Sequence, residues 1–170
     1  MNLVRTDRPD APQPAAPRFD LRLIGSELTP FSVRVEPGRL RSFALATGQA
    51  DPIYSDEAAA RRAGHPSLPV PPTFLFCLEM ESPDPMEVYE RLGIDYAQVL
   101  HGEQHFSYHR LAHAGETLYF RPRIADLYEK KNGALGFVVW ETRVEASDGS
   151  PVADLRSVMV VRDPVRQVAR

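Results

Sequence analysis

The sequence predicts an α+β domain in which a long antiparallel sheet wraps around one buried helix. Three observations predict this class. The last third of the chain holds four strand-like runs, at residues 101–109, 117–129, 136–146 and 151–162. The dipeptides Asn132-Gly133 and Asp148-Gly149, both strong hairpin signals, separate the later runs. A nearly continuous apolar segment, residues 73–80, comes before them and needs a sheet face to cover it.

Length and composition set the broad class. The 170 residues (19.1 kDa) fit one domain with a core of its own, and 43% hydrophobic and 25% charged residues are ordinary for a globular protein. A net charge of -3 gives no general attraction to nucleic acid or to an anionic membrane. Cys77 is the only cysteine, which excludes an intrachain disulfide and a zinc site built from several cysteines. No apolar run approaches the ~20 residues of a membrane span, and no signal-peptide core opens the chain. We therefore expect a cytoplasmic protein.

The first half of the chain predicts an arm, a strand and two helices. Residues 1–18 are rich in proline and alanine and predict a flexible arm, so that the domain spans residues 19–163 and a tail follows at 164–170. Apolar and polar residues alternate from Phe31 to Val35, as in a half-buried strand. A helix should begin at Glu36-Pro37 and end at Gly48. A second helix is expected over residues 56–63, with Ser55 as its N-cap and Gly64 at its end.

The middle of the chain holds the apolar segment 73–80. Periodicity alone does not decide between helix and strand for so short a run, but Pro71-Pro72 directly before it favours the start of a helix. Pro83 and Pro85 interrupt the segment, and residues 86–92 resume as a short helix before Gly93. The four later runs then predict an antiparallel meander.

Four histidines recur every four residues in the first of these runs and just after it: His101, His105, His109 and His113. On a strand the first three share a face but lie about 13 Å apart at their nearest, measured from the rise of ~3.3 Å per residue. That spacing is too wide for a common ion, so no metal is expected. Glu103 could form an acid/base pair with His101 only if no bulge intervenes at Gly102.

The most informative segment is residues 46–60, Ala-Thr-Gly-Gln-Ala-Asp-Pro-Ile-Tyr-Ser-Asp-Glu-Ala-Ala-Ala. It leaves one helix, crosses Gly48 and Pro52, and enters another. Such an overhang can hold polar side chains against a ligand. A helix connection without any chemistry explains the same pattern.

This segment resembles the signature of the MaoC-like hydratase/dehydratase family, which reads Gly-Asp-x-Asn-Pro-(Ile/Leu)-His, followed after a few residues by Ala. The matching residues are Gly48, Pro52, Ile53 and Ala60. The positions of the family's Asp, Asn and His hold Gln49, Asp51 and Tyr54. Residues 69–74, 101–106 and 115–117 look like the branch of fatty-acid-synthase-type dehydratase domains, so that the resemblance covers about residues 20–163.

The resemblance implies a fold, an assembly and a substrate. The fold would be the hotdog, a long antiparallel sheet around a central helix. Family members pair as homodimers, heterodimers or double hotdogs, with the acyl pocket at the interface, and act on acyl-CoA or acyl-carrier-protein thioesters without a further cofactor. The residues expected to bind substrate are Gln49, Asp51, Pro52, Tyr54, Thr73 and Phe74.

The departures from the signature change the expected mechanism. In the family the Asp and the His move the protons of hydration, whereas the carboxamide of Gln49 does not titrate and a phenol at Tyr54 is a poor base near neutral pH without strong tuning. The loss of one positioned acid or base costs about 10²–10⁴-fold in rate. In the family, a backbone N–H at the corner before the central helix binds the thioester oxygen. Here Pro71 and Pro72 occupy that corner and have no N–H, so the nearest donor is Thr73. We therefore expect the pocket-shaping half of a heteromeric dehydratase or hydratase, with a partner hotdog that supplies the Asp and the His.

Three alternatives stay open. A self-sufficient hydratase would use Asp51, Tyr54 or His65 in a rearranged site. A hotdog thioesterase would need a carboxylate on or beside the central helix, for which Glu79 and Glu81 are candidates. A non-catalytic acyl-CoA-binding module would need neither a rearranged catalytic site nor a carboxylate on the central helix.

Overall fold

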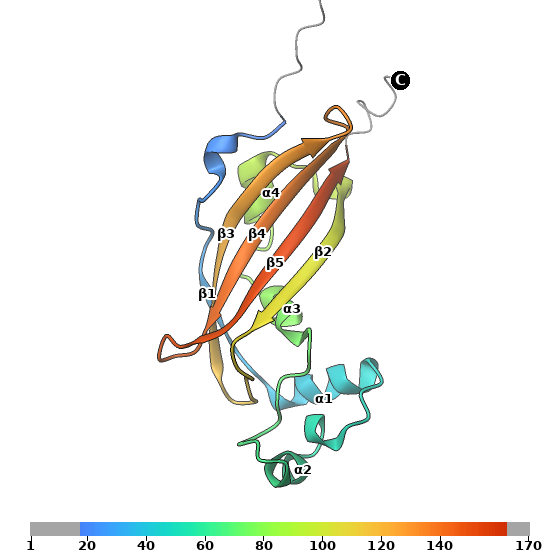
Figure 1. Ribbon diagram of the computed structural model, residues 1–170, viewed down its shortest axis with the longest axis vertical. Helices are drawn as coiled ribbons and strands as arrows, with labels where there is room; N and C mark the ends of the chain where they lie inside the picture. Colours follow the sequence, from blue (N-terminus) through green and yellow to red (C-terminus); the bar gives the residue numbers. More distant parts are fainter. Residues whose placement is uncertain (1–17, 163–170) are drawn as a thin grey trace, which may run out of the picture.

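One antiparallel sheet organises the protein, with its helices on one face and at one end (Figure 1). The structure is a computed structural model that describes residues 18–162, so the predicted arm up to residue 17 and the predicted tail lie outside the described residues. The strands are β1 (Phe31–Arg34), β2 (Val99–Tyr108), β3 (Thr117–Lys130), β4 (Leu135–Glu145) and β5 (Pro151–Arg162). The α-helices are α1 (Pro37–Ala46), α2 (Glu57–Arg62), α3 (Phe74–Glu79) and α4 (Glu87–Leu92). Short 3₁₀ turns are η1 (Leu21–Leu23), η2 (Pro52–Tyr54) and η3 (Tyr96–Gln98).

The strand order is β1-β3-β4-β5-β2. Tight turns join β3 to β4 and β4 to β5 at the two predicted hairpins. In the first turn Lys131 and Asn132 both have a φ of 53°, as the primed hairpin turns require. The predicted meander is therefore right for β3, β4 and β5 but wrong for β2. That strand pairs with β5 at the far edge of the sheet, because β1 occupies the free edge of β3, with Phe31 opposite Phe120.

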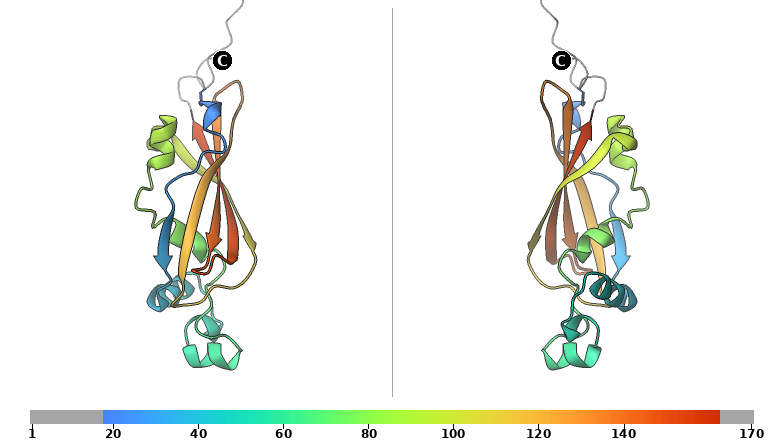
Figure 2. Two further views of the ribbon diagram at one scale, coloured as in Figure 1. Left: turned by 90° about the vertical axis from the view of Figure 1, so that its left-hand side faces the viewer. Right: turned by 90° about the vertical axis from the view of Figure 1, so that its right-hand side faces the viewer.

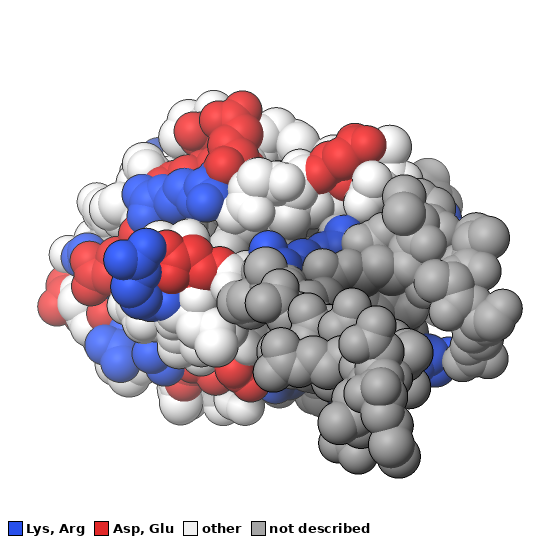
Figure 3. Space-filling model, turned by 90° about the horizontal axis from the view of Figure 1, so that it is seen from above, with Lys and Arg blue, Asp and Glu red and all other residues white. Residues whose placement is uncertain are grey.

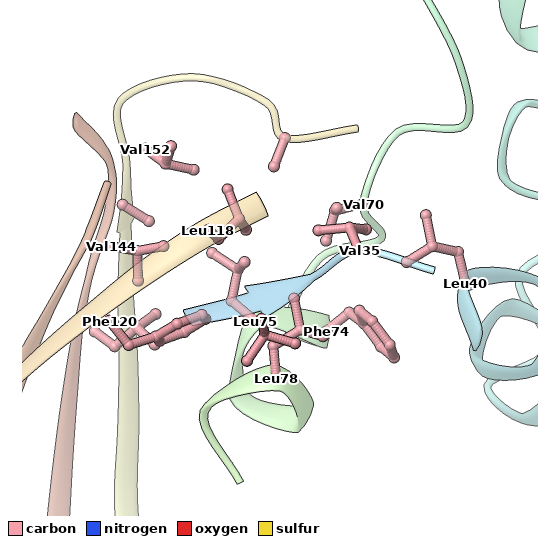
Figure 4. Packing of buried hydrophobic residues seen from close by; sticks show 14 of the residues in the cluster. Val35, Leu40, Val70, Phe74, Leu75, Leu78, Leu118, Phe120, Val144 and Val152 are labelled. Carbon is pink, nitrogen blue, oxygen red and sulfur yellow. The ribbon is translucent and has the colours of Figure 1, made fainter. Parts of the chain in front are cut away.

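The central helix α3 packs on the concave face of the sheet, as Figure 2 shows from both sides. It begins directly after Pro71-Pro72, which confirms the helical interpretation of the apolar segment. Leu75 and Leu78 are almost fully buried in a core completed by Leu118 and Phe120 from β3 (Figure 4). A long antiparallel sheet around a buried helix, the architecture predicted from the sequence, is confirmed.

The helical layer is interrupted. Pro83 and Pro85 separate α3 from α4, and Gly93 ends α4 in the left-handed conformation at φ 62°. Under α4 lies a second core cluster, in which Val88 and Tyr89 pack near Ile124. The inner face of the sheet is thus covered by two short helices with a connector between them, rather than by one long helix.

The segment from α1 to α2 forms an overhang at one end of the sheet (Figure 1). The first helix starts with Pro37 in its first turn and is followed by Gly48 at φ 70°, as predicted. The predicted N-cap of the second helix is wrong. Ser55 closes the turn η2, where its N–H donates to the Pro52 carbonyl at 3.1 Å, and the Asp56 side chain instead accepts from the N–H of Ala58 at 2.8 Å.

Charged side chains of both signs are interspersed on the surface. Figure 3 shows them at the end of the molecule that carries α4 and the β3–β4 hairpin. On the sheet, Arg121 pairs with Glu145 at 2.8 Å and Arg123 with Glu141 at 2.6 Å. Among residues 18–162, no helix is both long and apolar enough to cross a bilayer.

Candidate functional site

An apolar cavity of about 400 Å³ lies between the inner face of the sheet and the interrupted helical layer. A volume of this size is typical of small-molecule sites. Its apolar lining comes from both helices and from the central strands, and includes Phe76, Met80, Met86, Val88, Trp140 and Met159. The connector between α3 and α4 also lines the cavity, through Ser82, Asp84 and Pro85. Burial raises the pKa of Tyr89, another lining residue, to about 12, so its phenol stays neutral there.

Three carboxyl groups also line the cavity: Asp84 is exposed and Glu87 pairs with Arg91, whereas Glu79 reaches a buried position. Glu79, the last residue of α3, accepts a hydrogen bond at Oε1 from the hydroxyl of Thr142 on β4. Its Oε2 is buried and has no hydrogen-bond partner among the described residues. Burial raises the pKa of the Glu79 carboxyl, while the side chains of Thr142 and Trp140 lower it to a smaller extent. Of the two carboxylates considered for a thioesterase, Glu79 lies in the cavity, whereas Glu81 is half-exposed and pairs with Arg39.

His101 also lines the cavity, and its ring lies 5.2 Å from the ring of Phe76. The β2 register shifts between His101 and Glu103, so a bulge does occur at Gly102. Glycine is needed there, since an added Cβ would come within 3.0 Å of the Val158 carbonyl oxygen. The Glu103 carboxylate therefore pairs with His105, at 2.9 Å, while the His101 ring contacts Glu103 only at its backbone carbonyl, at 3.2 Å.

The predicted common face of three histidines is wrong for the same reason. The bulge turns His101 to the inner face, while His105 lines a charged groove that also includes Asp154. That aspartate pairs with His109 at 2.8 Å. No group of three or more His, Cys, Asp or Glu side chains in the described part of the chain is placed to hold a metal ion.

The overhang carries the residues that occupy the signature positions. The Gln49 side-chain oxygen accepts from the N–H of Asp51 at 3.2 Å, and the Asp51 carboxylate accepts from the N–H of Ile53 at 3.1 Å. Asp51 thus caps η2, which the exposed Pro52 begins and the half-buried Tyr54 ends. The Tyr54 N–H donates to the Asp51 carbonyl at 3.2 Å, but within residues 18–162 no side-chain hydrogen bond or ion pair joins Asp51 to Tyr54 or His65.

The corner before α3 has an unusual backbone. Thr73 adopts the left-handed conformation at φ 68°, and its N–H donates to the Tyr108 hydroxyl at 3.1 Å. Pro71 and Pro72 have no N–H to offer. Phe74 is 3% exposed and packs edge-on against Phe43, so it belongs to the core and does not line the cavity.

A histidine pair connects the overhang to the sheet. His65, which follows α2, lies 3.4 Å from His113 between their ring nitrogens, Nδ1 and Nε2. The carboxylate of Glu116 accepts from the His113 backbone N–H at 2.8 Å and is also bound by Arg110 at 2.6 Å. Burial lowers the pKa of His113, and Glu116 opposes this to a smaller extent. The His65 side chain therefore contacts His113 and forms no side-chain hydrogen bond with Asp51 or Tyr54.

We expect this pair to make the protein less stable in mild acid. Because the pKa of His113 is lower in the folded chain than in the unfolded chain, the unfolded state takes up a proton first as the pH falls from neutral to about 5. The free energy of unfolding should therefore decrease over this range, and His113→Gln should reduce that decrease. Urea unfolding at several pH values measures it. His109→Gln, at an exposed histidine, is the control, and equal pH slopes for the wild type and His113→Gln would contradict the prediction.

The edge strand β2 is left open on one side. Most of its residues are exposed, with Leu100 and Tyr108 at 47% and 46%. An open edge presents unpaired backbone N–H and C=O groups that can bond to a strand of another chain. Tyr108 lies at the end of this edge and contacts the corner at Thr73, so a chain paired here would lie close to that corner.

Comparison with known proteins places this geometry in context. The family profile described as "FAS1-like, dehydratase domain region" matches residues 22–155. A UPF0336 protein of Saccharopolyspora erythraea is 34% identical over 146 residues, which cover 85% of this chain and 92% of the relative. A UPF0336 protein of Streptomyces coelicolor is 41% identical over 102 residues, which cover 59% of this chain and 67% of the relative.

Among solved structures, the HadBC (3R-hydroxyacyl-ACP dehydratase) complex of Mycobacterium tuberculosis aligns with a TM-score of 0.71 at 23% identity, covering 81% of this chain and 96% of that one. The ChsH1-ChsH2 complex of the same organism aligns at 0.66 and 22% identity, covering 82% and 90%. A MaoC-like dehydratase aligns at 0.73 and 20% identity, covering 84% of this chain and 43% of the other. These structures share the hotdog fold with this chain.

Proposed function

Since the chain belongs to the FAS1-like dehydratase-region family and to the UPF0336 proteins, we propose that it is the pocket-shaping subunit of an acyl-thioester dehydratase or hydratase. A partner hotdog would supply the proton-transfer residues. One observation carries the proposal: this chain holds an apolar cavity of about 400 Å³, while the positions of the family's Asp and His hold Gln49 and Tyr54.

The chemistry of the overhang supports the division of labour. Addition of water to an enoyl thioester needs one group that takes a proton from water and another that protonates the α-carbon. Gln49 does neither, and the carboxylate of Asp51 is engaged with the backbone of its own turn. Gln49, Asp51, Pro52 and Tyr54 would then shape the polar entrance of the site rather than react.

The thioester would lie near the corner at Thr73, and the acyl chain would enter the cavity. Thr73 offers its N–H to the thioester oxygen if that oxygen displaces the Tyr108 hydroxyl. Phe74 would support this corner from the core. The substrates would be 3-hydroxyacyl and enoyl thioesters of CoA or an acyl carrier protein, and the reaction requires no further cofactor.

A second hotdog subunit would pair along β2, whose exposed edge is the open side of the sheet. The similarity to two complexes, HadBC and ChsH1-ChsH2, supports an assembly of unlike chains. A pair of identical chains would have Gln49 and Tyr54 in both halves, and so would lack the two proton-transfer groups altogether.

The proposal is tested by measuring the hydration of crotonyl-CoA in three assays. The first contains this chain alone, the second a candidate partner that carries the Asp and the His, and the third both chains together. We expect activity to rise sharply in the mixture and the two chains to elute as one complex. Strong activity from this chain alone would overturn the proposal. In that case Asp51→Asn and Tyr54→Phe identify a self-sufficient site, because each should then lower the rate by about 10²-fold or more.

A thioesterase is the second candidate, because Glu79 places a carboxyl on the central helix inside the cavity. Release of free CoA from an acyl-CoA, followed with a thiol reagent, distinguishes it from water addition. A complex that binds acyl-CoA without either reaction would identify a non-catalytic binding module.

A further inference from the structure

We propose that Glu79 and Thr142 form a polar subsite inside the acyl cavity, which selects acyl chains that carry a keto or hydroxyl oxygen several carbons away from the thioester. This inference rests on the proposed function, since it assumes that the cavity seats the acyl chain. It adds a substrate class to that function: oxygenated acyl thioesters rather than plain alkyl ones.

Glu79 has one carboxyl oxygen, Oε2, that no side chain or backbone group of the described residues occupies. Thr142 donates to Oε1, whereas Oε2 is buried and unpartnered, and no basic side chain of residues 18–162 forms an ion pair with Glu79. A buried polar atom without a partner is costly, and few such atoms occur in a native protein. Only one other buried side-chain atom of the described residues, Nε2 of Gln104, shares this condition.

The surroundings indicate what kind of group completes the site. Burial without a cation raises the pKa of Glu79, which favours the protonated carboxyl. A protonated carboxyl accepts from Thr142 through one oxygen and donates through the other. Its natural partner is a neutral oxygen acceptor, such as a ketone or a hydroxyl, because an anionic group would find no Lys or Arg among the lining residues.

The position along the cavity separates this subsite from the reacting end of the ligand. Glu79 ends α3 and Thr73 precedes it, so six residues at a rise of 1.5 Å place the two backbone positions about 9 Å apart along the helix. Phe76 and Met80, on the same helix, make the lining around Glu79 apolar. An oxygen near Glu79 is therefore in the middle of a long chain and is not the oxygen that is eliminated.

A plain alkyl chain would also fit the cavity, but at a disadvantage. It would displace water from Glu79 and leave the carboxyl without a partner. Sites built to hydrogen-bond a ligand oxygen reject the analogue that lacks it for this reason. The subsite thus acts by penalising the plain chain as well as by binding the oxygenated one.

Isothermal titration calorimetry on the full chain, as it purifies, tests the inference. The probes are dodecanoyl-CoA and a set of oxo-dodecanoyl-CoAs in which the ketone is moved along the middle of the chain. We expect one or two ketone positions to bind about tenfold more tightly than dodecanoyl-CoA, as one added neutral hydrogen bond allows. Glu79→Leu should abolish this preference and tighten the binding of dodecanoyl-CoA. Glu79→Gln, whose amide keeps a donor and an acceptor, should retain the preference.

Two further variants control for misfolding of Glu79→Leu and for a general effect of removing a carboxylate. Thr142→Val removes the hydrogen bond to Glu79 without changing the carboxyl, and it should weaken the ketone preference even if Glu79→Leu does not fold. Glu81→Gln changes a carboxylate of the same segment that pairs with Arg39 instead, and it should leave the preference unchanged.

The outcomes separate this inference from the proposed function. Equal affinity for the plain and the oxygenated probes would overturn the polar subsite and leave the acyl seat in place. Binding of none of the probes would overturn the acyl seat, and the subsite with it. Release of CoA from the probes would assign Glu79 to thioester cleavage and would also overturn the inference.

Discussion

If the chain has the function proposed above, Met86→Trp is expected to shorten the acyl chain that the proposed complex accepts. Met86 lines the cavity just before α4, on the helical layer and not on the edge strand β2 itself, so that subunit pairing along β2 should not be disturbed. An indole in the cavity would exclude about four methylene groups of a long chain. At ~0.8 kcal/mol for each buried methylene, the loss is about 3 kcal/mol, or roughly 10²-fold in kcat/KM for a dodecenoyl thioester. Rates with crotonyl-CoA, which is too short to reach Met86, should stay the same.

The ratio of the two rates is the measurement that matters. Tyr119→Trp introduces the same side chain at an exposed position of β3 outside the cavity, and it should change neither rate. If Met86→Trp lowered the rates of the long and the short substrate equally, the cavity would not be the seat of the acyl chain.

Phe120→Ala is expected to destabilise the fold by about 3–5 kcal/mol. Phe120 is fully buried on β3 and stacks on Phe31 of β1, with ring centroids 5.0 Å apart and ring planes within 6°. The substitution would leave a void between the edge strand and the cluster around α3, and it would remove the main side-chain contact of β1 with β3. Urea unfolding at equilibrium measures the change.

Tyr119→Ala is the matched control for this substitution. Tyr119 precedes Phe120 on the same strand, points to the opposite face and is 39% exposed. Its truncation should change the free energy of unfolding by no more than about 0.5 kcal/mol. A similar loss in both variants would show that β3 tolerates no change of side chain, rather than that Phe120 supports the core.

Features encoded by neighbouring residues could be predicted from the sequence. Asn132-Gly133 allows the backbone angles of a tight hairpin, Pro37 and Gly48 delimit α1, and Gly93 ends α4, because each of these depends on a few adjacent residues. The order of the strands depends on which edge is free. The short strand β1 takes the edge of β3, and no local pattern in the chain indicates that β2 must cross to β5.

The same distinction, between features encoded by neighbouring residues and features formed by distant ones, applies to the candidate site. The overhang was predicted because its signature is contiguous, and the structure places Gln49, Asp51 and Tyr54 on it. An acyl pocket was expected from the family resemblance, but its lining could not be predicted, since it comes from positions as distant as Leu28 and Met159. The sequence raised the possibility of a bulge at Gly102 but did not predict that it forms. Because of this bulge, His101 is the one member of the regularly spaced histidines that lines the cavity.

Under the proposed function, the proline-interrupted connector between α3 and α4 has a consequence for how proteins of this family can diversify. Acyl length would depend on a loop that carries neither the sheet register nor the subunit contact. Insertions or deletions between residues 80 and 86 could therefore retune substrate size while the partner is kept. In such a protein, selectivity and assembly can evolve independently, which is unusual for a pocket formed beside an oligomer interface.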